Sequence, residues 1–357
     1  MSNADERIDT LDLLRGIAAL AVVSLHFAWP GGAVPFPRAY LAVDVFFVLS
    51  GFVIAYAYQH RLDSGMPVRR YFLARLVRLY PLYIFATLLG AAWIAQGLLR
   101  QGSIEALGPW ALALAGAALF LPDPLGARAL FPLNEPAWSL FFELLVNLLY
   151  GALAVRLSNR ILGALILAGA ALLGFAIAQM GTLNVGFDWD NAAWGSGRAL
   201  FSFFVGVGVF RCRQRHRLTA VPIWLVSLVL LASFVPSPGR QPWFYDLACI
   251  VVLYPLLVWT AADASAGRAM IGLSRRLGYL SYPLYALHWP LGLILASLAR
   301  HGIGVTTQAS PILAPLVHFG AVIGVAWLVA RSFDTPVRAR LKRRYRLSAD
   351  APAQTAP

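Results

Sequence analysis

Long apolar runs, separated by short polar loops, make up most of this chain. Eleven runs can be delimited, at about residues 11–29, 40–59, 78–97, 109–121, 136–156, 160–180, 197–211, 220–236, 243–262, 277–299 and 311–331. Most of them approach the ~20 residues that an α-helix needs to cross the hydrocarbon core of a bilayer. The hydropathy pattern therefore predicts an all-α fold, a polytopic membrane helix bundle.

The basic residues indicate which runs cross the membrane and in which direction. Arginines and lysines concentrate in segments 60–78, 211–217 and 263–276 and in the C-terminal segment that ends at Arg346. Such clusters are typical of cytoplasmic loops. All four lie on one side if run 109–121, which has 13 residues, is a re-entrant or interfacial segment. We therefore expect about ten transmembrane helices, with both termini in the cytoplasm.

The composition agrees with a membrane protein and argues against nucleic-acid binding. Of the 357 residues, 59% are hydrophobic and 13% are charged, and the net charge is +13. Soluble proteins carry about 25% charged residues. Because the basic residues lie in short loops between apolar runs, the positive-inside rule accounts for the charge. We expect the lipid bilayer as a partner and no nucleic acid.

The same pattern predicts one membrane domain, residues 1–346, followed by a disordered cytoplasmic tail, residues 347–357. The acidic start of the chain differs from the basic start of a cleaved signal peptide. The two cysteines, Cys212 and Cys249, form no disulfide framework and adjoin no cluster with metal-ligand spacing. No metal site is expected.

Arg15 and His26 are the most informative residues of the first apolar run. They are eleven positions apart, which on an α-helix places both side chains on nearly the same face, about 16 Å apart along the axis. Ionisable side chains inside membrane segments are costly, and their presence suggests a function. The pair suggests a polar path through the bilayer, basic at one end and capable of acid–base chemistry at the other.

Asp44 lies near the start of the second run and would share the depth of His26 if the first two helices are antiparallel. A carboxylate beside an imidazole fixes the tautomer of the ring and stabilises the imidazolium. Asp44 is equally interpretable as an acidic residue at a helix N-terminus near the membrane interface. The residues alone leave both interpretations open.

Five motifs, in order, resemble the landmarks of the bacterial membrane-bound acyltransferase-3 family. They are RIDTLDLLRGIAALAVVSLH, VDVFFVLSGFVI, RLVRLYPLY, PAWSLFFE and LSYPLYALH, and the resemblance covers residues 7 to about 331. Members of this family O-acylate sugars and other cell-envelope or secreted acceptors, with acyl-CoA from the cytoplasm as the donor. The resemblance therefore implies a multi-pass O-acyltransferase of the bacterial inner membrane.

The resemblance also implies roles for individual residues. His26 would be catalytic, as a general base or as the carrier of an acyl-histidine. Glu143, the glutamate of the tryptophan–serine–glutamate landmark, joins Asp44 as a candidate catalytic acid and is a candidate to hold the acceptor near the outer side. The second glutamate of that landmark is replaced here by Leu144.

Three arginines, Arg15, Arg75 and Arg78, would bind the acyl-CoA. Guanidinium forks suit phosphates, and Arg75 and Arg78 share a helix face because they are three residues apart. Snorkelling of Arg15 and membrane anchoring by the other two are the structural alternatives. Candidates for acceptor contacts or for stabilising the oxyanion are Ser50, Trp138, Tyr282, Tyr285 and His288.

The expected reaction moves an acyl group, with acetyl favoured, from acetyl-CoA or another acyl-CoA to a hydroxyl of an envelope or exported carbohydrate, without a permanently bound cofactor. Two alternatives stay open. One is a ten-helix transporter or flippase that uses Arg15, His26 and Glu143 for substrate or proton coupling. The other is an acyltransferase that acts on a small-molecule acceptor.

Overall fold

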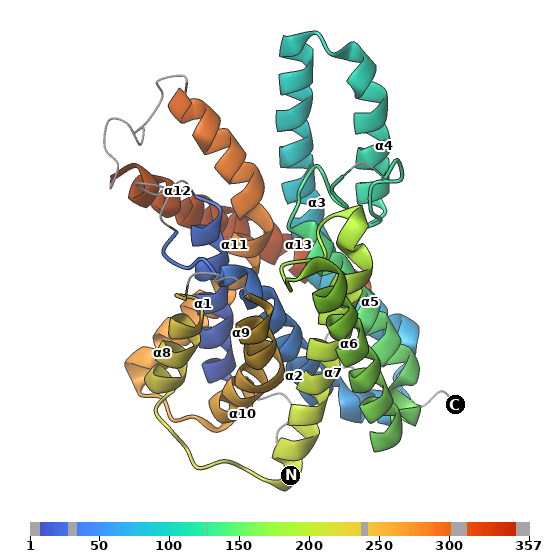
Figure 1. Ribbon diagram of the computed structural model, residues 1–357, viewed down its shortest axis with the longest axis vertical. Helices are drawn as coiled ribbons and strands as arrows, with labels where there is room; N and C mark the ends of the chain where they lie inside the picture. The colour runs from blue at the N-terminus through green and yellow to red at the C-terminus, as the bar shows by residue number, and fades with distance from the viewer. Residues whose placement is uncertain (1–7, 28–33, 127, 237–241, 301–312, 348–357) are drawn as a thin grey trace.

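Figure 1 shows the computed structural model, which describes residues 8–27, 34–126, 128–236, 242–300 and 313–347. Helices make up almost all of this part of the chain, so the all-α prediction is confirmed. The α-helices are α1 (Asp9–Leu25), α2 (Ala42–Asp63), α3 (Val68–Gln101), α4 (Leu107–Ala118), α5 (Ala137–Leu153), α6 (Asn159–Met180), α7 (Ala192–Arg215), α8 (Ile223–Ser233), α9 (Pro242–Ala248), α10 (Tyr254–Asp263), α11 (Arg268–Arg300), α12 (Leu313–Val329) and α13 (Thr335–Arg344).

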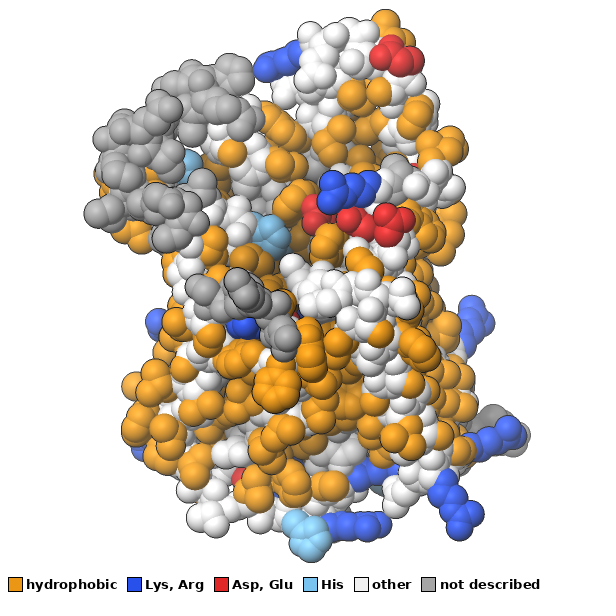
Figure 2. Space-filling model, viewed as in Figure 1, with side chains coloured by type: hydrophobic (Ala, Val, Ile, Leu, Met, Phe, Trp, Pro, Cys, Tyr) orange, Lys and Arg blue, Asp and Glu red, His pale blue; other side chains and the backbone are white. Residues whose placement is uncertain are grey.

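The exterior of the bundle has the character expected of a membrane protein. Among the described residues, seven helical segments are long and apolar enough to cross a membrane. Hydrophobic side chains cover much of the surface in Figure 2, and on α6 Leu167 and Phe175 are 71% and 59% exposed. Side chains of this kind favour contact with lipid over contact with water. The chain is a polytopic helical membrane protein, whereas the count of ten crossings and the side of the termini stay predictions.

The centre of the bundle is formed by α1 and α2 (Figure 1). Helix α1 packs most extensively against α11, and α2 packs most extensively against α7, which α6 covers on its other side. Helices α8 and α10 contact α1 on one flank, and α3 packs against both α5 and α11. Residues from the beginning, the middle and the end of the chain therefore meet between α1, α2, α3, α5 and α11.

The basic segments 60–78, 211–217 and 263–276, which we expected to be loops, are largely helical. Helix α3 begins at Val68, after the N-cap residue Pro67, so that Arg75 and Arg78 lie on the same continuous helix as the apolar run that follows. The basic segment near the C-terminus forms α13, which is joined to α12 by a π-helical turn, Ala330–Asp334. Arginine and lysine have high helix propensity, which allows a helix to continue beyond its apolar part.

The short run 109–121 forms most of α4, which returns beside α3 as an antiparallel hairpin (Figure 1). The indole of Trp110 donates a hydrogen bond of 3.1 Å to the carbonyl of Ala91 and ties the two helices together. Helix α4 has 12 residues and extends over about 18 Å, less than the ~30 Å of a hydrocarbon core. The short segment is therefore present, and its re-entrant or interfacial position stays a prediction.

The two ends of the chain fall mostly outside the described residues. Residues 1–7 of the predicted membrane domain and residues 348–357 of the predicted tail are among those that the structure does not describe. The disorder expected for the tail therefore stays a prediction.

Helices α2 and α7 approach so closely that two glycines are required at their contact. A Cβ atom on Gly51 would lie 1.9 Å from the carbonyl oxygen of Phe203, and one on Gly206 would lie 2.1 Å from that of Val48. Both distances are far below van der Waals contact. The glycine at position 51 is thus explained by backbone packing, and it follows directly after Ser50, a candidate site residue.

Replacing Gly51 by alanine is expected to lower the free energy of unfolding by about 1–3 kcal/mol, because the added methyl group must push α7 away from α2. Thermal unfolding of the purified protein in detergent measures this loss. Gly163→Ala on α6 is the matched control, because open space surrounds that position and alanine favours the helix. Equal melting temperatures for Gly51→Ala and the wild type would contradict the close packing.

Candidate functional site

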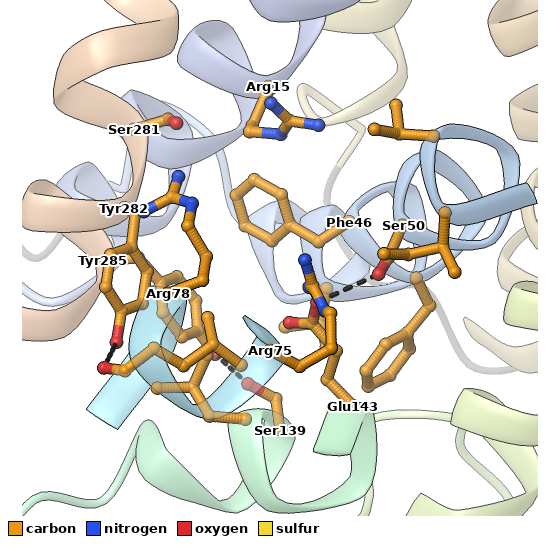
Figure 3. A pocket seen from close by; sticks show the side chains of 16 residues that line it. Arg15, Phe46, Ser50, Arg75, Arg78, Ser139, Glu143, Ser281, Tyr282 and Tyr285 are labelled. Carbon is orange, nitrogen blue, oxygen red and sulfur yellow. Dashed lines mark hydrogen bonds and ion pairs between the residues drawn. The ribbon is translucent and has the colours of Figure 1, made fainter. Parts of the chain in front are cut away.

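Two adjoining cavities lie at the centre of the bundle. We call the first the arginine cavity; it has a volume of about 170 Å³ and receives residues from α1, α2, α3, α5 and α11. Its polar lining consists of Arg15, Ser50, Arg75, Arg78, Ser139, Glu143, Ser281, Tyr282 and Tyr285 (Figure 3).

The carboxylate of Glu143 organises one side of the arginine cavity. Its Oε1 atom accepts hydrogen bonds from the Ser50 hydroxyl at 2.9 Å and from Arg75 Nη2 at 3.2 Å (Figure 3). Helices α2, α3 and α5 are thereby linked through one carboxylate. We expected Glu143 to hold the acceptor near the outer side; the structure places it beside Arg75 in the arginine cavity, and its role stays a prediction.

The arginine cavity carries more positive than negative charge. Arg78 lies over the ring of Tyr282, 5.2 Å from its centroid, and Arg15 forms an ion pair of 2.8 Å with Asp12. Arg78 Nη1 and Arg75 Nε are buried and have no hydrogen-bond partner among the described residues. Buried donors are normally satisfied, so unused guanidinium N–H groups around a cavity favour binding of an anion.

We call the second cavity the histidine cavity. It has a volume of about 170 Å³ and is lined by Val22, Leu25, His26, Tyr40, Val43, Glu135, Pro136, Trp138, Asn184, Phe187, Arg198 and Tyr285. His26 is the C-cap residue of α1, and its side chain is exposed. The arginine and histidine of the first helix therefore line different cavities.

Tyr285 forms the wall between the two cavities. It lines both of them, as does Val43. The Tyr285 hydroxyl is hydrogen-bonded to the Ser139 hydroxyl and to the Pro136 carbonyl, and Phe46 packs edge-on against its ring at 5.4 Å. A ligand that reaches from the arginines to His26 must therefore pass this wall.

The hydrogen bond of His26 fixes its tautomer. Nδ1 lies 2.9 Å from the Val22 carbonyl oxygen. A carbonyl can only accept, so in the neutral ring Nδ1 carries the hydrogen and Nε2 carries the free lone pair. Nε2 is therefore available to accept a proton.

His288 lies directly behind His26. The ring centroids are 4.8 Å apart, and Trp289 contacts His26 edge-on at 5.5 Å. Nδ1 of His288 lies within 3.1 Å of the carbonyls of Leu284 and Tyr285, and its Nε2 is buried without a partner among the described residues. Neutral His288 thus presents an acceptor at Nε2, which does not suit it to donate a hydrogen bond to an oxyanion.

Asp44 has a different partner from the one we expected. Arg198 on α7 binds both of its carboxylate oxygens, Nη2 at 2.6 Å and Nε at 3.2 Å, and both side chains are fully buried. The hydrogen bonds of the described residues include none between Asp44 and His26. Asp44 pairs with Arg198 because a buried guanidinium is destabilising unless a carboxylate compensates its charge.

Arg198 was missed by the sequence analysis, although a signal was present. An arginine within the apolar stretch of α7 is an intramembrane charge of the kind that calls for a partner. Its remaining donors reach the Val185 carbonyl at 2.9 Å and the Tyr40 carbonyl at 3.0 Å, and its guanidinium lies over Trp138. Arg198 therefore positions three segments that border the histidine cavity.

A second buried pair, Arg38 with Asp246, continues this network, and the sequence analysis missed it as well. The Tyr40 hydroxyl donates to Asp246 at 2.8 Å, and Arg38 also binds the carbonyls of Pro236 and Pro242. Asp246 lies within the otherwise apolar α9, which was the available signal. The pair joins the start of α2 to α9.

Comparisons with known proteins agree with the motifs. The acyltransferase domain family matches residues 8–331. Protein 2 in the picA locus of Rhizobium radiobacter is 41% identical over 188 residues, which is 49% of this chain and 96% of that protein. Acyltransferase MdmB of Streptomyces mycarofaciens is 27% identical over 79% of this chain and 78% of its own length.

A more distant relative matches the chain in sequence over most of its length. The peptidoglycan O-acetyltransferase OatA of Listeria monocytogenes is 23% identical over 93% of this chain, which spans 56% of that protein. No solved structure matches the chain significantly.

Asp44→Asn is expected to lower the free energy of unfolding by about 3–5 kcal/mol, because it leaves the buried Arg198 charge uncompensated. Thermal unfolding in detergent measures the loss, and the double variant Asp44→Asn/Arg198→Gln should recover part of it. Arg128→Ala is the control, because its pair with Asp188 involves a guanidinium that is 88% exposed. A stable but inactive Asp44→Asn protein would indicate that Asp44 takes part in the reaction.

Proposed function

The chain belongs to the acyltransferase-3 family of membrane acyltransferases, and on this premise we propose that it is an O-acyltransferase that moves an acetyl group from acetyl-CoA to a hydroxyl of an envelope or exported glycan. One observation carries the proposal: a cavity lined by three arginines adjoins a cavity that contains an exposed histidine with a free Nε2. The first suits a phosphorylated donor, and the second suits an acceptor hydroxyl.

The donor would bind in the arginine cavity. Arg15, Arg75 and Arg78 hold the phosphate-bearing end of the acyl-CoA, and the unpartnered donors of Arg75 and Arg78 supply its hydrogen bonds. The pantetheine arm is long and thin, so it extends past Tyr285 and brings the thioester toward His26. Glu143 keeps Arg75 in place and leaves the lining with a net positive charge.

The reaction that we propose is a direct transfer at His26. Nε2 accepts the proton of the acceptor hydroxyl while the hydroxyl oxygen attacks the thioester carbon. The new carbon–oxygen bond forms, the carbon–sulfur bond breaks, and the CoA sulfur leaves and takes up the proton from His26. An acyl ester and free CoA are the products, so no further reactant is needed.

The developing oxyanion needs a hydrogen-bond donor. Tyr285 borders both cavities, and its hydroxyl, which donates to the Pro136 carbonyl at 3.2 Å in the structure, would turn toward the oxyanion. Its hydroxyl lies at the wall between the cavities, next to that of Ser139. The Ser50 hydroxyl is engaged by Glu143, and the Tyr282 hydroxyl donates to the Leu79 carbonyl. We therefore assign Ser50 and Tyr282 to holding the arginine cavity together. We assign Trp138 to the acceptor side.

The position of the basic segments supports a cytoplasmic donor. Arg69 and Arg70 begin α3, and α13 carries further arginines and a lysine, so the arginine cavity faces the basic end of the molecule. We place this end in the cytoplasm of a bacterium, with both termini, and the acceptor on the opposite side of the plasma membrane.

His26→Ala is expected to reduce acyl transfer by about 10²–10⁴-fold, because removal of a general base costs that much. Membranes that contain the protein are incubated with radiolabelled acetyl-CoA, and label in the glycan fraction is counted. His216→Ala is the matched control, because this histidine is exposed on the loop after α7 and lines neither cavity.

Equal labelling by the His26→Ala protein and the wild type would show that His26 is not the general base. Label in a small-molecule fraction would replace the glycan by a small acceptor. Absence of label with every acceptor and acyl length would favour a transporter that uses the same residues.

Arg78→Gln is expected to raise the KM for acetyl-CoA about tenfold with a smaller effect on kcat, since a charge-assisted hydrogen bond contributes about 1.5–3 kcal/mol. Initial rates at varied acetyl-CoA measure it. Arg69→Gln, an exposed arginine at the start of the same helix, is the control. An unchanged KM would restrict Arg78 to membrane anchoring.

A further inference from the structure

Glu135 supplies the one carboxylate among the residues that line the histidine cavity. It lies in the loop before α5, and its side chain is half-buried. Among the described residues, no hydrogen bond or ion pair engages this side chain. The nearby acids are engaged elsewhere: Asp44 by Arg198, and Asp246 by Arg38 and Tyr40.

The backbone around Glu135 is held firmly. Its carbonyl accepts a hydrogen bond of 3.3 Å from the Trp138 amide, and the Ala137 amide donates to the Asn134 carbonyl at 2.9 Å. The Asn134 side chain in turn donates to the Ala286 carbonyl on α11 at 3.4 Å. The free carboxylate is therefore attached to a fixed part of the cavity, next to the start of α5.

The surroundings of Glu135 make an unpartnered carboxylate costly. Burial raises its pKa, the negative charge of Asp188 raises it further, and Arg128 acts in the opposite direction. A partly desolvated acid gains from a hydrogen-bond donor. A ligand hydroxyl in the cavity provides such a donor without bringing a new charge.

The remaining lining suits a polyhydroxylated ligand. Trp138, Phe187 and Tyr40 present aromatic side chains, and Asn184 adds an amide. Aromatic faces pack against the apolar faces of sugar rings, while a few polar groups fix the orientation of a ligand. In Figure 2 a few acidic side chains gather in the upper half of the face seen there, with a Lys or Arg side chain against them.

We propose that Glu135 is an acceptor-binding residue, whose carboxylate accepts a hydrogen bond from one hydroxyl of a carbohydrate acceptor while His26 receives the neighbouring hydroxyl. The proposal rests on the proposed function and adds the group that orients the acceptor. Glu135 takes up no proton in the transfer. Its role is to hold the sugar in the one orientation that presents a hydroxyl to His26.

Binding of neutral oligosaccharides tests this role independently of catalysis. The full-length protein, purified in detergent, is titrated with cellotetraose and with chitotetraose, and the tryptophan fluorescence is followed because Trp138 lines the cavity. Trp138→Phe assigns the signal to this site. Glu135→Gln and Glu135→Ala are each expected to weaken binding of the responding sugar about tenfold, with CoA binding unchanged.

Asp190→Asn is the matched control, because this acid is exposed nearby and does not line the cavity. Monodisperse elution and an unchanged melting temperature show that a variant is folded, and Glu135→Gln has nearly the shape of the wild-type side chain. Sugar binding that is equal in both Glu135 variants and the wild type would overturn the proposal. So would a wild-type protein that binds neither sugar.

The sugar titration and the acetyl-transfer assay together separate the two proposals. Sugar binding that depends on Glu135, in a protein that transfers no acetyl group, would keep the binding site and reject the acyl transfer. Acetyl transfer with a KM for the acceptor that is unchanged in Glu135→Gln would keep the transfer and reject the role of Glu135.

Discussion

The buried ion pair between Arg198 and Asp44 is the interaction on which the rest of the site depends. Both charges are removed from solvent, and this is tolerable only because the guanidinium binds two carboxylate oxygens and two backbone carbonyls. Through these bonds α7 fixes the start of α2 and the loop before α7. The close contact at Gly51 and Gly206 also fixes α7 against α2.

This scaffold separates two chemical environments that the proposed reaction needs. Three arginines gather on one side of Tyr285, and His26 lies on the other. A phosphorylated donor and a neutral sugar require opposite surroundings, one rich in cationic donors and one with aromatic faces and a single acid. The proposed transfer requires a thin acyl-bearing arm to cross this wall, to which Tyr285 of α11 and Val43 of α2 contribute side chains.

Glu143 and Glu135 illustrate how position decides the role of an acid. Glu143 lies among arginines and binds Arg75 and Ser50, on the side that we propose for the donor. Glu135 borders the cavity of His26, and no cation of the described part of the chain forms an ion pair with it. Among the described residues, no hydrogen bond or ion pair engages the Glu135 carboxylate, whereas Oε1 of Glu143 accepts two hydrogen bonds.

The sequence by itself determined the helical membrane class, the family and the presence of Arg15, His26, Arg75 and Arg78, since apolar period, charge distribution and ordered motifs are local properties. It did not determine that α3 extends back to Val68, because helix propensity and loop signals compete there. The tertiary structure alone decided the partners of the charged residues. Asp44 pairs with a residue 154 positions away, and such a pair is set by packing that no local pattern encodes.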